Sequence, residues 1–155
     1  MLKLKSKAPS FEIPDQDSTS VTLNDYKGKW LVLYFYPRDN TPGCTTEALG
    51  FTAARDDFAA LNTEILGVSP DSEKSHCKFI DKHQLKLRLL SDTEHVMLEH
   101  YGVWQLKRMY GKEYHGVVRS TYIIDPEGNI AAGWEKVRVK GHVDAVLEKL
   151  KELQG

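Results

Sequence analysis

Short apolar runs and longer amphipathic segments follow one another along the whole chain. The run Trp30–Tyr36 is continuously apolar, rich in aromatic residues and bounded by turns, which is typical of a strand buried on both faces. Further short strands are predicted at 64–69 and 87–92, and two strand-like pieces within 10–23 flank a polar turn. The apolar runs therefore predict a sheet with a fully buried central strand.

Segments with helical periodicity separate these strands. Apolar residues after Cys44 recur at one helical face, so a helix is expected to follow that loop. Residues 71–84 predict a polar helix, 93–103 a helix closed by Gly102, and the C-terminal segment an amphipathic helix. The apolar positions of the first and last helices are Phe51, Ala54, Phe58 and Leu61, and Val143, Val146, Leu147, Leu150 and Leu153.

The order of the elements predicts the fold class. Segments 116–125 and 130–139 flank the turn sequence PEGN and indicate a β-hairpin. The resulting order β-β-β-α-β-α-β-α-β-β-α has no low-complexity linker and no repeat, so we expect one domain over residues 1–155. It fits a three-layer α/β fold with a mixed central sheet, in which the parallel β-α-β part comes first and the hairpin closes the sheet.

Composition excludes several classes of protein. The 21 basic and 22 acidic residues nearly cancel and form no long run of one sign, which argues against nucleic acid or an anionic membrane as partner. The N-terminal sequence MLKLKSKAPS has no apolar core of a signal peptide, and no segment is apolar enough to span a membrane. Two cysteines without a CxxC pair predict free thiols in a reducing compartment, so we expect a cytoplasmic protein. The sequence has no heptad seam and no long exposed apolar edge, so we expect a monomer.

Cys44 is the candidate for chemistry because of where it stands. It follows the buried strand and the turn residues of PRDNTPG, and it precedes a helix. Helix N-termini present unpaired N–H groups and favour an anion. An ordinary cysteine is only about 3% thiolate at pH 7, so this position can raise the reactive fraction. The alternative is that Cys44 is a small packing residue in a Pro-Gly turn.

Neighbouring residues refine this hypothesis. Glu47 would repel a thiolate in the same helical turn, so a cation must offset its charge; Arg119, which opens the sequence RSTYIID, is the candidate. Thr41 supplies a hydroxyl three residues before the sulfur, able to hold an incoming oxygen. Pro37 and Pro42 stiffen the loop and remove two N–H groups.

The spacing of Pro37, Thr41 and Cys44, P-x-x-x-T-x-x-C, resembles the active-site motif of the peroxiredoxins. The longer sequence YFYPRDNTPGCTTEA, together with LLSD, GVW, MYGK and RSTYIID, looks like the bacterioferritin comigratory protein, or peroxiredoxin Q, branch. The resemblance covers nearly the whole chain. It implies a thioredoxin-like fold and a thiol peroxidase without metal or flavin.

The resemblance also implies roles for single residues. Cys44 would attack the peroxide and become a sulfenic acid, and Thr41 and Arg119 would hold the peroxide oxygens. Pro42 and Gly43 would complete the substrate site, with Pro42 shielding the sulfenate from water. The expected substrates are hydrogen peroxide and small organic hydroperoxides, and the expected reductant is of the thioredoxin or glutaredoxin type.

The second cysteine departs from the branch. Many members carry a resolving cysteine five residues after the first, where this chain has Leu49. Others carry it on the next predicted helix at the position of Ile80, one turn beyond Cys77. Cys77 is therefore expected to resolve Cys44 as an intramolecular disulfide. The alternatives are a one-cysteine cycle with an external thiol, or a redox sensor or holdase that uses Cys44 without turnover.

No catalytic or metal-binding role is predicted for the histidines. His76 precedes Cys77 and is interpreted as a surface residue. His95 and His100 are five residues apart, which does not suit a metal pair on one helix face. No cofactor is indicated.

Overall fold

A five-stranded mixed sheet forms the centre of the computed structural model, which describes residues 1–155. Its order is β5-β4-β3-β8-β9, and β3 pairs parallel to β4 and antiparallel to β8. β4 and β5 are parallel, and β8 and β9 are antiparallel. The strands are β3 (Trp30–Phe35), β4 (Thr63–Ser69), β5 (Arg88–Ser91), β8 (Ser120–Ile124) and β9 (Ile130–Trp134). The predicted parallel half and closing hairpin are both present.

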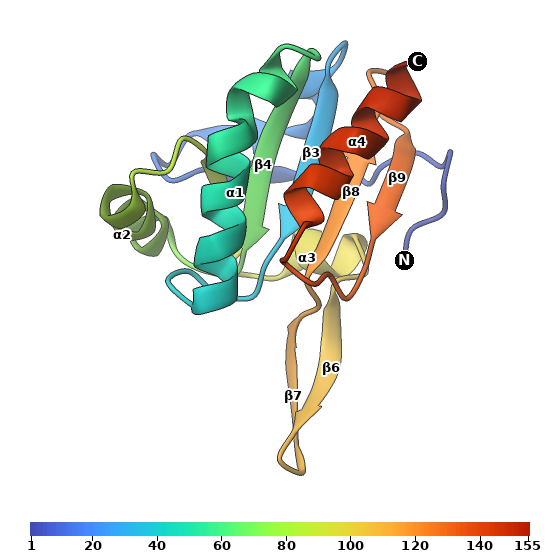
Figure 1. Ribbon diagram of the computed structural model, residues 1–155. Helices are drawn as coiled ribbons and strands as arrows, with labels where there is room; N and C mark the ends of the chain where they lie inside the picture. The colour runs from blue at the N-terminus through green and yellow to red at the C-terminus, as the bar shows by residue number, and fades with distance from the viewer.

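Helices cover both faces of the sheet, which gives the predicted three layers (Figure 1). The helices α1 (Pro42–Ala59) and α4 (His142–Gln154) lie side by side on one face. The short helix α3 (Val96–His100) lies on the other face, behind the sheet in Figure 1. Helix α2 (Glu73–His83) lies at one side of the molecule, with Ser72 as its N-cap.

The buried central strand explains the layers. Alternate residues of β3 point to opposite faces, so each face receives an apolar set of its own. Leu31, Leu33 and Phe35 belong to the core under α3, whereas Val32 and Tyr34 belong to the core under α1 and α4. The second core also contains Cys44, which places the thiol against the sheet.

The N-terminal segment closes the α3 side. Strands β1 (Glu12–Pro14) and β2 (Ser20–Thr22) form the small antiparallel pair expected from the sequence. A 3₁₀ turn, η1 (Leu23–Tyr26), follows. No helix of the protein is long and apolar enough to cross a membrane.

A second hairpin was missed by the pattern of apolar residues. Strands β6 (Trp104–Met109) and β7 (Lys112–Val117) form a separate antiparallel pair that extends away from the body (Figure 1). The single strand expected over 116–125 is therefore wrong at its start, because β7 ends before β8 begins. Tyr110 and Gly111, both at positive φ, make the turn. Most of the hairpin is exposed, so burial imposes no apolar alternation on it.

Candidate active site

Cys44 lies in the first turn of α1, two residues after Pro42 at the helix start. Thr41 is the N-cap residue, and its side chain makes no capping hydrogen bond to the helix. The thiol is almost fully buried, with 1% of the residue exposed. The amide groups at this helix end have no intrahelical acceptor, so they can donate to an oxygen bound beside the sulfur.

Arg119 lies over the thiol. It sits in the short connection between β7 and β8, and its Nη2 donates to the Cys44 Sγ at 3.2 Å. Its Nη1 donates to the Glu47 Oε1 at 2.7 Å. One half-buried guanidinium thus binds both the sulfur and the carboxylate, which are one helical turn apart on α1.

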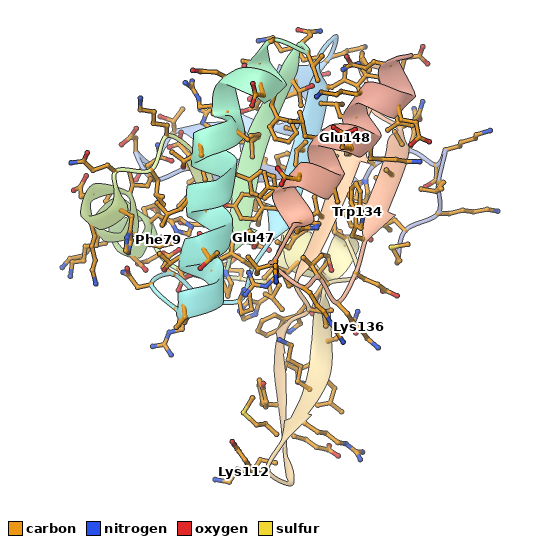
Figure 2. The ribbon with its side chains drawn as sticks, in the orientation of Figure 1. Glu47, Phe79, Lys112, Trp134, Lys136 and Glu148 are labelled. Carbon is orange, nitrogen blue, oxygen red and sulfur yellow. The ribbon has the colours of Figure 1, made fainter.

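Glu47 is a fully buried acid on the side of α1 turned toward the sheet and α4 (Figure 2). Burial raises the pKa of Glu47 to about 7, and the charge and hydrogen bond of Arg119 only partly oppose this. The Oε2 atom has no hydrogen-bond partner, which leaves the ionised form poorly solvated. The negative charge that the sequence placed against a Cys44 thiolate is therefore reduced at neutral pH.

The raised pKa of Glu47 predicts a pH-dependent stability. Between pH 4.5 and 7 the folded protein keeps a proton that the unfolded chain has lost, so the free energy of unfolding falls as pH rises. The loss amounts to about 3 kcal/mol across this window. Glu47→Gln should remove this part of the pH dependence. Urea unfolding of both proteins from pH 5 to pH 8 measures it, and a constant difference between them over this range would contradict the assignment.

Gly43 permits the close approach of the guanidinium. A Cβ atom built on Gly43 would lie 3.2 Å from Nη2 of Arg119. Any side chain there would press on the atom that binds the thiol. Gly43 therefore belongs to the site through its lack of a side chain.

The remaining motif residues line the same loop. Pro37 follows Tyr36, the residue that continues β3, and is partly buried. The hydroxyl of Thr41 donates to the carbonyl of Arg38 at 2.8 Å, which fixes its rotamer. Pro42 is exposed at the first position of α1. The structure thus brings Pro37, Thr41, Pro42 and Gly43 to the helix end that holds Cys44.

Lys107 is a site residue that the sequence analysis missed. It lies on β6, and its chain crosses Gly116 of β7, whose added Cβ would meet the Lys107 Cδ at 3.4 Å. Burial and the charge of Arg119 lower the pKa of Lys107, and the charge of Cys44 acts in the opposite sense. Lys107 is therefore a second cation whose charge acts on Arg119 and Cys44. The β6–β7 hairpin that carries Lys107 has no apolar alternation, so the sequence pattern could not predict that Lys107 belongs to the site.

Cys77 lies on α2 and does not contact Cys44. Both cysteines are free. The half-buried Cys77 thiol donates to the carbonyl oxygen of Gln16, in the β1–β2 turn, at 3.1 Å. A disulfide between the two cysteines therefore requires at least one of the helices α1 and α2 to move.

His76, interpreted as a surface residue, is in fact fully buried. Its Nδ1 lies 2.8 Å from Oδ2 of Asp39, a residue of the loop between β3 and α1. With Asp71 these residues form the one group of ligand atoms close enough to hold a metal ion. However, both ring nitrogens of His76 already have protein partners, so the hydrogen bonds account for the group without an ion.

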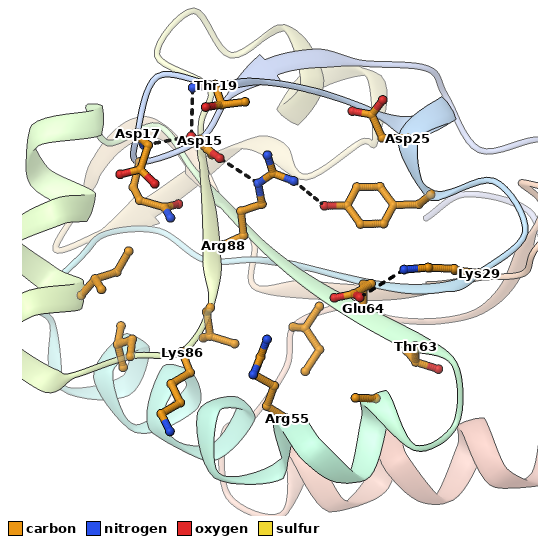
Figure 3. A pocket seen from close by; sticks show the side chains of 17 residues that line it. Asp15, Asp17, Thr19, Asp25, Lys29, Arg55, Thr63, Glu64, Lys86 and Arg88 are labelled. Carbon is orange, nitrogen blue, oxygen red and sulfur yellow. Dashed lines mark hydrogen bonds and ion pairs between the residues drawn. The ribbon is translucent and has the colours of Figure 1, made fainter.

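A wide groove of the surface is lined by none of the residues around Cys44 and is shown in Figure 3. It measures about 890 Å³ and is lined by residues of both charges from β1–β2, α1, β4 and β5. Arg88 spans it, donating to Asp15 at 2.7 Å and to the hydroxyl of Tyr26 at 3.1 Å.

Comparison with known proteins agrees with this site. The model of the AhpC/TSA family matches residues 4–132. The chain is 49% identical over 152 residues to Peroxiredoxin Bcp of Bacillus subtilis, covering 98% of this chain and 97% of that one. Peroxiredoxin Bcp of Xanthomonas campestris is 45% identical over 150 residues, with 96% and 94% of the two chains covered.

Two solved structures share the fold. The bacterioferritin comigratory protein of Xanthomonas campestris has a TM-score of 0.88 at 44% identity, covering 92% of this chain and 90% of that one. A mutant of PrxQ from Xylella fastidiosa has a TM-score of 0.95 at 38% identity, covering 100% and 99%. The chain therefore belongs to the AhpC/TSA family, in the bacterioferritin comigratory protein or peroxiredoxin Q branch of the peroxiredoxins, and is a thiol peroxidase with a thioredoxin-like fold.

Proposed function

We propose that Cys44 reduces hydrogen peroxide and small organic hydroperoxides. The observation that carries this proposal is the Arg119 guanidinium, whose Nη2 lies 3.2 Å from the sulfur at the N-terminus of α1. A cation and free helix amides beside one thiol stabilise its thiolate, the nucleophilic form. The bacterioferritin comigratory protein of Xanthomonas campestris is described as reducing alkyl peroxides, which supports the organic substrates.

The reaction conserves atoms and electrons in one displacement. The Cys44 thiolate attacks one peroxide oxygen, an S–O bond forms and the O–O bond breaks. Sulfur is oxidised to the sulfenic acid, and the other oxygen leaves as an alkoxide or hydroxide that takes a proton. Arg119 and the free amides of α1 can stabilise the charge that moves onto the leaving oxygen. The Thr41 oxygen, whose hydrogen is donated to the Arg38 carbonyl, can accept a hydrogen bond from the O–H of the attacked oxygen, and the Pro42 ring restricts access of water.

Cys77 is the proposed resolving residue. It is the only other cysteine of the chain, and α2, which carries it, has a largely polar sequence. Disulfide formation needs Cα atoms within about 7 Å, so at least one of α1 and α2 must open locally after oxidation. The disulfide would then be reduced by a thioredoxin- or glutaredoxin-type protein, which suits a reducing compartment such as the cytoplasm.

Gly50 lies within α1, where the low helix propensity of glycine would be expected to make this helix easier to open. A glycine inside a helix costs about 1 kcal/mol relative to alanine. A Cβ atom there would lie 3.0 Å from a methyl group of Val143 on α4, so the glycine permits close packing of the two helices. That contact fastens α1, and α2 is the element more easily released.

The disulfide is tested with one equivalent of peroxide. We expect mass spectrometry after non-reducing digestion to find a peptide that links Cys44 to Cys77. Cys77→Ser should instead accumulate a Cys44 sulfenic acid, which dimedone would trap. A wild-type product in which Cys44 is a stable sulfenate and Cys77 is still alkylated would favour the one-cysteine cycle.

A steady-state assay separates the enzyme from a redox sensor or holdase. With peroxide and a thioredoxin system, repeated turnover is expected. Stoichiometric oxidation without turnover, with every thiol donor tried, would support the sensor.

A further inference from the structure

A set of hydrogen-bonded polar groups joins the loop before Cys44 to α2, and Tyr36, Asp39 and His76 are its buried members. Oδ1 of Asp39 accepts a hydrogen bond from the Tyr36 hydroxyl at 2.6 Å. Oδ2 accepts from the Ser75 hydroxyl at 2.7 Å and lies 2.8 Å from Nδ1 of His76. The backbone N–H of Asp39 donates to Asp71 at 2.8 Å. Asp39 is thus bound by Asp71, which precedes α2, and by Ser75 and His76 in the first turn of α2.

Each ring nitrogen of His76 has a buried partner. Nδ1 lies 2.8 Å from Oδ2 of Asp39, and Nε2 lies 3.0 Å from the carbonyl oxygen of Leu90 on β5. The His76 and Asp39 side chains are 0% and 2% exposed, so water does not compete for their contact. Losing one partner would leave a buried polar atom unsatisfied.

This pair also fixes which way α2 faces. His76, Phe79 and His83 share one helix face by their spacing, and His76 and Phe79 are the buried residues of α2. Figure 2 shows Phe79 on the side of α2 that faces the body of the protein. Cys77 is rotated by about 100° from His76 around the helix. While His76 is bound to Asp39, Cys77 is therefore turned to the Gln16 carbonyl rather than toward the loop that carries Cys44.

We propose that Asp39 and His76 are positioning residues that latch α2 and set the rate at which Cys77 reaches oxidised Cys44. The inference rests on the proposed resolving role of Cys77. In that step the Cys77 thiolate attacks the Cys44 sulfenic sulfur, an S–S bond forms and the S–O bond breaks. The hydroxide that leaves takes the proton lost by the Cys77 thiol, giving water.

The latch connects the residues of the two steps, peroxide reduction by Cys44 and disulfide formation by Cys77. Asp39 lies in the loop that leads to Thr41 and Cys44, and His76 is the neighbour of Cys77. A second, weaker tie runs in parallel, since Nε2 of His83 lies 3.2 Å from Oδ1 of Asn40 at an exposed position. Breaking the buried pair leaves buried polar atoms without partners, which costs more than losing an exposed hydrogen bond.

Rapid quench with an alkylating reagent measures the latch. Wild type, His76→Gln and Asp39→Asn are each oxidised with one equivalent of peroxide, and the Cys44–Cys77 peptide is quantified against time. We expect its first-order formation to be about tenfold faster in both variants, the order expected for the loss of one buried hydrogen bond. His83→Gln is the matched control, because it removes a tie between the same helix and loop; its rate should stay within about twofold.

Hydrogen exchange shows whether the effect is local. In His76→Gln the amides of α2 should exchange about tenfold faster, while those of β3 and β4 keep their protection.

Three results would overturn the latch. Equal disulfide rates in wild type and both variants would do so, and so would an equal gain in His83→Gln. A His76→Gln protein with lost protection in β3 and β4 would show a general loss of stability in place of a local release. If wild type forms no Cys44–Cys77 disulfide, the resolving role of Cys77 fails and the latch fails with it. Faster exchange confined to α2 would then still identify the pair as a purely structural clasp.

Discussion

Cys44→Ser should lose peroxide reduction completely, because the hydroxyl of serine does not ionise at neutral pH and cannot supply the thiolate. We expect stopped-flow mixing with hydrogen peroxide to show no oxidation phase in this variant. The structure makes the substitution a clean test, since the buried sulfur makes its one hydrogen bond with Arg119 and serine can accept the same bond. The fold should therefore be retained, which circular dichroism and urea unfolding check.

Cys77→Ser is the matched control for this experiment. It also replaces the sulfur of a cysteine by oxygen, but Cys77 lies on α2 and bonds only to the Gln16 carbonyl. Its first oxidation by peroxide should be as fast as in wild type, even though recycling is impaired. Slow oxidation at the same rate in wild type and in Cys44→Ser would remove the basis for Cys44 as the reacting residue.

The fold could be predicted because burial controls the sequence of its central elements. Trp30–Tyr36 must be apolar on both faces, since α1 and α4 cover one face of β3 and α3 covers the other. The same argument fails for β6 and β7. These strands project from the body, so exposed residues such as Leu106 and Tyr110 follow no apolar alternation.

In the candidate site, Arg119 could be predicted from the sequence, whereas the burial of His76 could not. A carboxylate and a thiol in one helical turn require a cation, and the place of Arg119 at the start of the predicted strand RSTYIID made it the candidate. His76 was misread because its partner Asp39 is 37 residues away, and a histidine among polar residues resembles a surface position. The local sequence holds no sign of such a distant partner. Only the packing of α2 against the loop reveals that the histidine is buried.

Arg119→Ala should slow peroxide reduction by about 100-fold or more, the loss typical of removing one preorganised donor from a reacting centre. The guanidinium binds the Cys44 sulfur with Nη2 and Glu47 with Nη1, so its removal takes the cation from both. Alkylation of Cys44 by iodoacetamide at pH 7 should slow as well, because less thiolate is present. The two measurements separate the roles: alkylation reports the thiolate, whereas the additional loss with peroxide reports stabilisation of the leaving oxygen.

Arg88→Ala is the matched control, since it also breaks a hydrogen-bonded pair of arginine and carboxylate, at 2.7 Å from Asp15, but lies in the groove that none of the residues around Cys44 lines. It should keep the peroxide rate. Arg119→Lys tests the geometry of the fork. A single ammonium group cannot donate to both the sulfur and the carboxylate in the directions that the guanidinium uses. We therefore expect Arg119→Lys to regain less than a tenth of the peroxide-reduction rate that Arg119→Ala loses. Full activity in Arg119→Lys would show that the charge alone is sufficient, and unchanged peroxide and alkylation rates in Arg119→Ala would exclude Arg119 from the chemistry.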